Sequence, residues 1–113
     1  MTGYKKGEIY LVNFDPTIGS EVKKTRPAVI VSNNINNANS PIVSIAPITS
    51  NVTRVFSFEV ELTEGAFGLD RKSKVMINQT RAVDKSRLIR HIGTVNAPTL
   101  ELIGQALVLH YDL

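Results

Sequence analysis

The sequence predicts a mostly-β domain, a twisted β-barrel or half-open sheet closed by one C-terminal helix. Strand-like segments dominate the first two-thirds of the chain, and a helical pattern is confined to its last part. The 113 residues suffice for one hydrophobic core and are too few for two, so residues 1–113 are interpreted as a single domain. Hydrophobic residues make up 42% and charged residues 20%, a balance typical of a folded chain.

The first two predicted strands flank a polar turn. Residues 8–14 alternate loosely between apolar and polar side chains, which indicates a strand. Residues 15–20 (DPTIGS) combine Pro with Gly and predict a turn. Residues 27–31 (PAVIV) form a continuous apolar run, as expected of a strand buried on both faces. Pro27 has no N–H to donate to a neighbouring strand, so we expect it to open this strand.

The next segments continue the β pattern after an interruption. Residues 33–40 are rich in asparagine, which favours local turns, and predict a loop. Residues 42–48 form another apolar strand. Residues 56–62 alternate cleanly, so their apolar side chains should face the core while Ser57, Glu59 and Glu61 face solvent. Short strands are expected at residues 75–77 and 92–95, with a turn or single helical turn at residues 84–87 between them.

The C-terminal segment has helical periodicity. Asn96-Ala97-Pro98 resembles a helix start, with Pro in the first turn. Two apolar sides follow at helical spacing, one formed by Leu100, Ile103, Leu107 and Tyr111 and the other by Leu102, Ala106 and Leu109. One small core does not explain so much apolar surface, which suggests a dimer contact.

The composition excludes several kinds of chemistry. The chain has no cysteine, so disulfides, thiolate metal sites and thiol catalysis are ruled out. Its two histidines, His91 and His110, have no acidic cluster nearby, and no metal site is expected. No apolar run approaches the roughly 18 residues that span a bilayer, and no secretory signal is recognisable. We therefore expect a cytoplasmic protein without metal or membrane contact.

Basic residues are gathered in two stretches. Lys23, Lys24 and Arg26 form the first, and the second runs from Arg71 to Arg90; the net charge is +3. Two such stretches that converge in the fold would make a site for a polyanion. The competing interpretation is a solvated, merely charged surface.

Arg26 and the pair Thr49-Ser50 occupy positions where chemistry is possible. Arg26 comes where a polar turn becomes a buried strand, and its guanidinium offers paired donors suited to phosphate. It could instead pair with Glu21 and brace the turn. Thr49 and Ser50 follow an apolar strand and could bond phosphate oxygens or simply form a turn.

Gln79 and Arg81 are two apart in an extended stretch and therefore share a face. Together they could bind a base edge and a phosphate, or they could be solvated. A catalytic histidine is a weaker hypothesis, because a favourable interaction with the helix dipole already explains His110 in the last helical turn.

Several ordered motifs resemble the MazF/PemK family of toxin endoribonucleases over nearly the whole chain. The matching segments are Gly7–Pro16 (GEIYLVNFDP), Gly19–Glu21 (GSE), Arg26–Ser32 (RPAVIVS), Pro47–Thr49 (PIT), Asn78–Leu88 (NQTRAVDKSRL) and the Pro98-led helix. The resemblance implies an SH3-like barrel that forms a homodimer and needs no cofactor. It also implies metal-independent cleavage of single-stranded RNA, usually mRNA, and a cognate antitoxin that blocks the site.

The same resemblance assigns roles to individual residues. Arg26 and Thr49 match the catalytic pair of the family, and the positions that contact RNA include or adjoin Ser20, Glu21, Ser50 and Gln79. Lys24 and Arg81 extend this RNA-binding set through their charge. Two departures stand out: Asn78 replaces an acid found in many relatives, and Ala97 stands where a capping Ser or Thr is frequent, which would weaken the helix cap by about 1 kcal/mol.

A mechanism follows in which the RNA supplies its own nucleophile, the 2′-hydroxyl. Arg26 would stabilise charge on the phosphate, Thr49 with Ser50 would fix it, and Glu21 is the available general base because arginine stays protonated. The products would be a 2′,3′-cyclic phosphate and a 5′-hydroxyl. Sequence preference should come from residues 16–20, 33–40 and the Gln79 region, by hydrogen bonding more than by stacking.

Two other functions fit the same fold class. One is a toxin that inhibits DNA gyrase and cleaves nothing, and the other is a non-catalytic RNA-binding module. Arg26 and Thr49 favour the nuclease over both.

Overall fold

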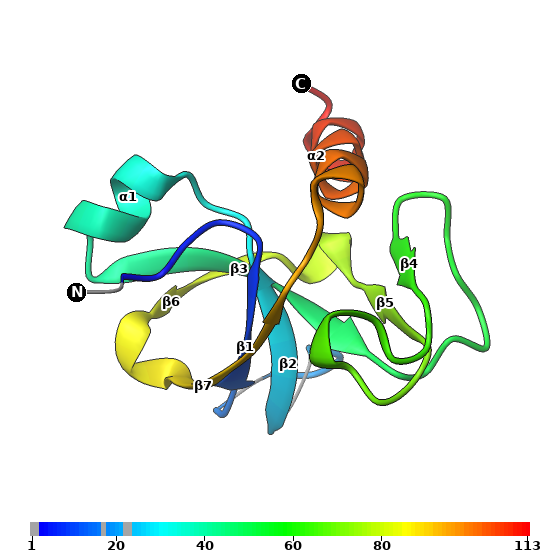
Figure 1. Cartoon of the computed structure of the whole chain (residues 1–113), viewed down its shortest axis with the longest axis horizontal. Coiled ribbons are helices and arrows are strands. Elements are labelled where there is room, and N and C mark those ends of the chain that lie inside the picture. Colours follow the sequence, from blue (N-terminus) through cyan, green and yellow to red (C-terminus); the bar gives the residue numbers. More distant parts are fainter. Residues whose placement is uncertain (1–2, 17, 22–23) are drawn as a thin grey trace.

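The computed structural model describes residues 3–16, 18–21 and 24–113, so Thr17 of the predicted turn and Lys23 of the first basic stretch lie outside it. The fold is a seven-stranded sheet with a C-terminal helix, which confirms the predicted mostly-β class (Figure 1). The strands are β1 (Glu8–Asn13), β2 (Thr25–Ile30), β3 (Ile42–Thr49), β4 (Val60–Leu62), β5 (Ser73–Val75), β6 (Arg81–Asp84) and β7 (Leu88–Thr94). The helices are α1 (Asn34–Asn39) and α2 (Ala97–Tyr111), with short 3₁₀ turns η1 (Ala66–Gly68), η2 (Ile77–Gln79) and η3 (Lys85–Arg87).

Every strand pairing is antiparallel, and the main path through the sheet runs β4-β5-β3-β2-β1-β7. Strand β3 has three partners along its length. It pairs with β6 through residues 42–45, with β2 through residues 45–47 and with β5 through residues 48–49. The sheet is thus a half-open barrel, and it divides at the end of β3.

The sheet separates two hydrophobic cores. Along β2, Val29 and Val31 at its end belong to the first core, while Ala28 and Ile30 belong to the second. This alternation confirms the prediction that the apolar run from Pro27 is buried on both faces. Helix α2 lies across the sheet in Figure 1 and covers the first core with Ile103 and Ala106.

The prediction that Pro27 opens its strand is wrong, because β2 begins two residues earlier at Thr25. At Pro27 the strand pairs with Leu11 of β1, whereas its pairing with β3 starts only at Ala28. Proline is tolerated here because one edge of β2 is without a strand partner at this point.

The predicted loop at residues 33–40 contains helix α1. The Asn33 side chain accepts a hydrogen bond from the Asn36 backbone N–H at 2.8 Å and caps the helix. Asn37 is fully buried, and its amide donates to the Ser32 carbonyl. The asparagines therefore stabilise a short helix by capping it and tying it to the sheet, where the sequence pattern indicated turns alone.

The predicted strand at residues 56–62 is shortened to Val60–Leu62, and two of its expected orientations are wrong. Phe56 is exposed and stacks on Phe58 at a centroid distance of 5.0 Å. Glu59 points inward, and its carboxylate lies 2.9 Å from the Lys74 ammonium, with only 4% of the Glu59 side chain exposed. This ion pair outweighs the alternation of the sequence, because a buried acid is stable when a cation neutralises it.

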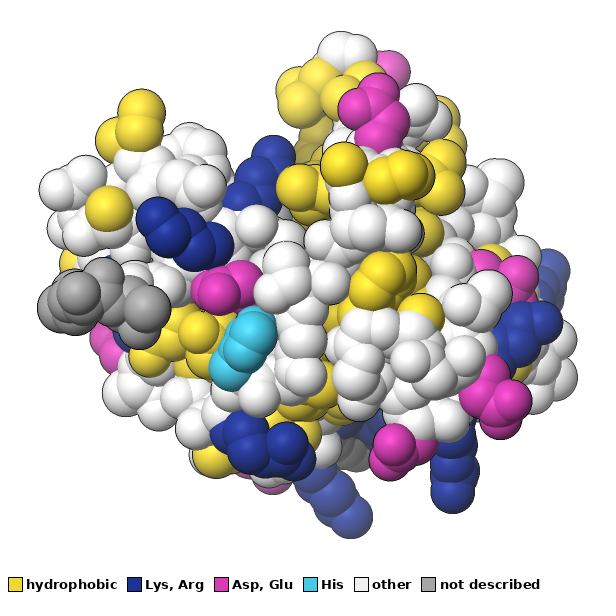
Figure 2. Space-filling model, in the orientation of Figure 1, with side chains coloured by type: hydrophobic (Ala, Val, Ile, Leu, Met, Phe, Trp, Pro, Cys, Tyr) yellow, Lys and Arg dark blue, Asp and Glu magenta, His cyan; other side chains and the backbone are white. Residues whose placement is uncertain are grey.

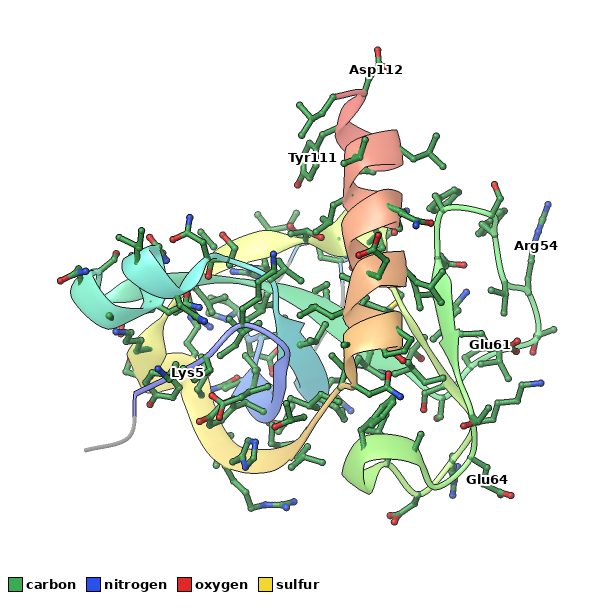
Figure 3. The ribbon with its side chains drawn as sticks, turned by 45° about the horizontal axis from the view of Figure 1, so that its top comes forward. Lys5, Arg54, Glu61, Glu64, Tyr111 and Asp112 are labelled. Carbon is green, nitrogen blue, oxygen red and sulfur yellow. The ribbon has the colours of Figure 1, made fainter. Side chains whose placement is uncertain are left out.

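Helix α2 confirms the predicted C-terminal helix, but its cap differs from the expectation. Asn96 is the N-cap and accepts from the Thr99 N–H at 3.0 Å, so Ala97 does not weaken the helix start. Beyond the buried side, Leu102, Val108 and Leu109 are about half exposed. Figure 2 shows hydrophobic side chains on the surface at the top of the view, where α2 lies, and Tyr111 lies at the outer end of the helix (Figure 3). This surface agrees with the expectation of a partner, and the homodimer stays a prediction.

Within the described ranges, no helix has the length and hydropathy to cross a membrane.

The η1 turn packs against β7 by backbone contact. A Cβ atom added at Gly93 would lie 1.9 Å from the Phe67 carbonyl oxygen, and one at Gly68 would lie 2.4 Å from the Ile92 carbonyl oxygen. Gly68 also has a φ of +86°, which side chains rarely adopt. These two glycines fix the segment that leads from η1 into β5.

We expect Gly93→Ala to lower the free energy of unfolding by about 1–3 kcal/mol, because the added methyl group collides with backbone that cannot rotate away. Gly104→Ala in α2 is the matched control: nothing lies within 4 Å of its added Cβ, so that variant should be about 0.5–1 kcal/mol more stable. Urea unfolding measures both. A Gly93→Ala variant as stable as the wild type would contradict the backbone contact.

Candidate RNA-cleavage site

A pocket opens where β3 leaves β2. Its volume is about 420 Å³, and we call it the fork pocket. The start of β2, the end of β3 and the segment before β5 supply its walls. Its lining residues are Lys24, Thr25, Arg26, Pro27, Ile48, Ser50, Leu69, Asp70, Arg71 and Ser73. Three cations face one carboxylate there, and three hydroxyls add hydrogen-bonding capacity, a composition suited to an anion.

Arg26 and Thr49 belong to the two strand ends that border this pocket. The last β2–β3 pair is Ala28 with Pro47, so Arg26 comes two residues before the paired part of β2 and Thr49 two residues after the part of β3 that pairs with β2. Thr49 instead lies opposite Lys74 of β5. The exposed Arg26 and the half-buried Thr49 therefore both lie beyond the point at which the two strands diverge.

The Thr49 hydroxyl already has one role. Its oxygen accepts a hydrogen bond from the Asn51 backbone N–H at 3.1 Å, which forms the turn that was the simpler interpretation of Thr49-Ser50. A threonine hydroxyl can accept and donate at the same time. The turn therefore orients Thr49 and leaves its O–H proton available to a phosphate oxygen.

A second pocket, of about 560 Å³, lies on the other side of the β3 end; we call it the amide pocket. Its polar lining comes from Ser20, Glu21, Asn78, Gln79, Thr80 and Arg81, and Phe14 and Pro47 form its apolar part. The Arg81 guanidinium carbon lies 5.9 Å from the centre of the Phe14 ring, a cation–π contact. The amide and hydroxyl side chains of the amide pocket can both donate and accept hydrogen bonds, as the edges of nucleobases require.

Glu21 holds the turn before β2. Its carboxylate accepts a hydrogen bond from the Ile18 N–H at 2.6 Å, and its own N–H donates to the Ile18 carbonyl at 3.2 Å. Glu21 and Arg26 line different pockets.

Arg87 fixes the other side of the same turn. Its guanidinium donates to the carbonyls of Asn13 at 3.1 Å and Asp15 at 2.6 Å. The Lys24 backbone N–H in turn donates to the Asp15 carboxylate at 2.9 Å. The end of β1 and the start of β2 are therefore tied together beside both pockets.

Comparison with known proteins identifies the family. The family model for "PemK-like, MazF-like toxin of type II toxin-antitoxin system" matches residues 5–111. The chain belongs to the PemK/MazF toxin family. It is 40% identical over 114 residues to Endoribonuclease MazF9 of Mycobacterium tuberculosis, covering 96% of this chain and 97% of that protein. It is 30% identical over 110 residues to Endoribonuclease EndoA of Bacillus subtilis, covering 96% and 95%.

Solved structures confirm the PemK/MazF fold. MazF from Deinococcus radiodurans (Form-I) aligns over the whole of both chains with a TM-score of 0.86 at 24% identity. A mycobacterial endoribonuclease in complex with its cognate antitoxin aligns over 97% of this chain and 96% of its own, with a TM-score of 0.81 at 22% identity. The family resemblance noted in the sequence is therefore confirmed.

The structure distributes the predicted site residues over both pockets of this family member. Lys24, Arg26 and Ser50 line the fork pocket, whereas Ser20, Glu21, Gln79 and Arg81 line the amide pocket. Thr49 lines neither, but it lies between Ile48 and Ser50 of the fork pocket. Asn78, which the sequence marked as a departure from the family, lines the amide pocket. Sequence reasoning missed Asp70, Arg71 and Thr80 as lining residues, and the signal for Arg71 was its place in the second basic stretch.

Neither histidine lines these pockets. His91 lies on β7, where its Nε2 is 3.9 Å from the Glu8 carboxylate and its ring is 5.2 Å from the Tyr10 ring. His110 contacts Tyr111 at the end of α2. In the part of the chain that the structure describes, no group of three or more His, Cys, Asp or Glu side chains could hold a metal ion.

Glu8 also affects Tyr10, whose hydroxyl donates to the Glu8 carboxylate at 3.5 Å. Burial, followed by the charge of Glu8, raises the pKa of Tyr10 to about 12. An unfolded chain releases this proton near pH 10. The contribution of Tyr10 to stability is therefore complete below about pH 10 and is lost as the pH rises toward about 12.

We predict that Tyr10→Phe becomes progressively more stable relative to the wild type between about pH 10 and 12, because phenylalanine has no proton to lose. Urea unfolding at several pH values measures the difference. Tyr111→Phe, at an exposed position in α2, is the control for the substitution itself. A difference between Tyr10→Phe and wild type that is constant over this range would contradict the raised pKa.

Proposed function

We propose that this chain is a toxin endoribonuclease that cuts single-stranded RNA without a metal ion and is neutralised by a cognate antitoxin. Family membership and the names of the two endoribonuclease relatives support the enzyme class. The observation that carries the proposal is the fork pocket, where Arg26 lies with Lys24 and Arg71 beside the end of β3.

In the proposed reaction, the 2′-oxygen of the RNA attacks the adjacent phosphorus, and the bond from phosphorus to the 5′-oxygen breaks. The 2′-hydroxyl proton goes to a base, and the leaving 5′-oxygen gains a proton. A 2′,3′-cyclic phosphate and a 5′-hydroxyl result. Arg26 stabilises the negative charge that develops on the non-bridging oxygens, and Thr49 donates a hydrogen bond that holds the phosphate in line.

The two pockets suit different parts of an RNA strand. The fork pocket takes phosphate, with Lys24 and Ser50 beside Arg26. The amide pocket takes a nucleobase, whose edge meets Ser20, Gln79 and Arg81. Unpaired bases can be turned out of a single strand and read in this way, so the separation favours single-stranded RNA as substrate.

The antitoxin and the homodimer are proposed on separate grounds. Among the structures with this fold is a toxin bound to its cognate antitoxin. Leu102 and Leu109 leave an apolar strip along one side of α2 that a second copy of the chain could bury. The cytoplasm, where mRNA is translated, is the proposed compartment.

Arg26→Ala should lower the rate of cleavage by about 100- to 1000-fold, because the charge that stabilises the transition state is lost. Arg26→Lys should recover only part of the rate, since an ammonium cannot contact two phosphate oxygens in one plane. The assay follows single-stranded RNA in the presence of EDTA. A DNA strand of the same sequence is the substrate control, and Arg90→Ala, on β7 outside both pockets, is the protein control.

The proposed mechanism would be wrong if the wild type failed to cleave RNA in EDTA, or if Arg26→Ala cleaved at the wild-type rate. Inhibition of DNA supercoiling without any RNA cleavage would instead indicate the gyrase-directed alternative.

Glu21 is proposed as general base, in competition with its role in the turn. Glu21→Gln separates the two, because glutamine can still accept the Ile18 N–H through its carbonyl oxygen but cannot take a proton. A base predicts a loss of about 100-fold or more in Glu21→Gln. If Glu21 only holds the turn, Glu21→Gln should cleave like the wild type while Glu21→Ala is impaired.

A further inference from the structure

Arg71 lies in the fork pocket and has no assigned role. It is an exposed residue between η1 and β5, and it lines the same pocket as Lys24 and Arg26 although it comes from another part of the fold. Two walls of the pocket therefore contribute one guanidinium group each, that of Arg26 and that of Arg71. An anion that entered would meet charge from both sides.

The segment that carries Arg71 is well fixed. Gly68 contacts the backbone of β7, and the neighbouring Leu69 is buried in the first core with 6% of its surface exposed. The Ser73 hydroxyl donates to the Arg71 carbonyl at 2.8 Å. Anchors on both sides thus hold the Arg71 backbone in place, which lowers the entropy lost when its side chain binds a ligand.

The cations next to Arg71 are neutralised, whereas Arg71 is not. Lys72 pairs with Glu61 at 3.1 Å, and Lys74 pairs with Glu59 at 2.9 Å. Within the ranges 3–16, 18–21 and 24–113, the Arg71 guanidinium has no such ion pair. Its charge is therefore available to an anion in the pocket.

We propose that Arg71 binds the RNA phosphate next to the scissile phosphate and so sets the position of the RNA strand in the fork pocket. This inference rests on the proposed function. Arg26, near the start of β2, takes the scissile phosphate, and Arg71 contacts the next phosphate of the RNA from the η1–β5 wall of the pocket. Arg71 is thus a positioning residue, because it contacts the substrate away from the reacting atoms.

The test is binding of an RNA oligonucleotide that carries one 2′-deoxy nucleotide at the mapped cleavage position, so that it binds but cannot react. Each phosphate contact on a single strand contributes about 0.7 to the slope of log affinity against log salt. Arg71→Ala should therefore lower this slope by about 0.7 and weaken binding about fivefold near 0.1 M salt. Lys72→Ala is the matched control, because it removes the same charge from the adjacent, paired position.

A methylphosphonate at a single position of the oligonucleotide removes the charge of one phosphate and locates the contact. Neutralising one phosphate that flanks the scissile one should weaken binding to the wild type and leave binding to Arg71→Ala unchanged. Arg71→Lys should keep the salt slope of the wild type. Thermal unfolding of each variant shows whether the fold is intact.

The inference is overturned if Arg71→Ala and Lys72→Ala bind alike. It is also overturned if Arg71→Ala weakens binding to the same extent with each of the two singly neutralised oligonucleotides, whichever flanking phosphate is neutral. Cleavage of the all-RNA oligonucleotide by the wild type is measured in parallel. Cleavage that depends on Arg26, together with no effect of Arg71→Ala, would refute only the role of Arg71. Absence of cleavage by the wild type would refute the proposed function and this inference with it.

Discussion

The change of partner along β3 is the constraint on which the rest of the structure depends. The strand pairs with β2 up to Pro47, and from Ile48 onward its pairing is with β5 on the other edge. The β2 edge is therefore open at Arg26, and the fork pocket forms there. The same divergence separates the amide pocket from the fork pocket, with the end of β3 between them. A strand that stayed paired with β2 to its end would close this opening.

Burial on both faces makes that arrangement rigid. Val43 and Ile45 of β3 pack into the second core, and Ala46 and Ile48 pack into the first. A shift of register by one residue would exchange these two sets and turn Ser44 and Thr49 toward the opposite core. Packing in the two cores therefore fixes the register of β3 against β2, and with it the point at which the two strands diverge.

The sequence predicted what depends on local pattern and missed what depends on distant contacts. The apolar run from Pro27 predicted its own burial and the α2 periodicity predicted a helix, and both predictions were confirmed. The inward turn of Glu59 depends on Lys74, fifteen positions away, and no local pattern contains that information. The same applies to the site: motifs singled out Arg26, Thr49 and Gln79, but their division between two pockets follows from where β3 leaves β2. Arg71 was visible only as one charge in a basic stretch.

The distribution of paired charges also explains how a net charge of only +3 can make an anion site. Lys72 and Lys74 are neutralised by acids on or beside β4, and Arg87 is engaged with backbone carbonyls of the turn after β1. The two acids offset the charges of Lys72 and Lys74, while Arg87 ties together the turn beside the site. Lys24, Arg26 and Arg71 are concentrated in one pocket with Asp70 as the only acid in its lining. Charge in a low-dielectric cleft attracts an anion more strongly than the same charge spread over a surface. The attraction proposed for an RNA backbone therefore depends on which cations line this pocket, and the total charge is a poor guide to it.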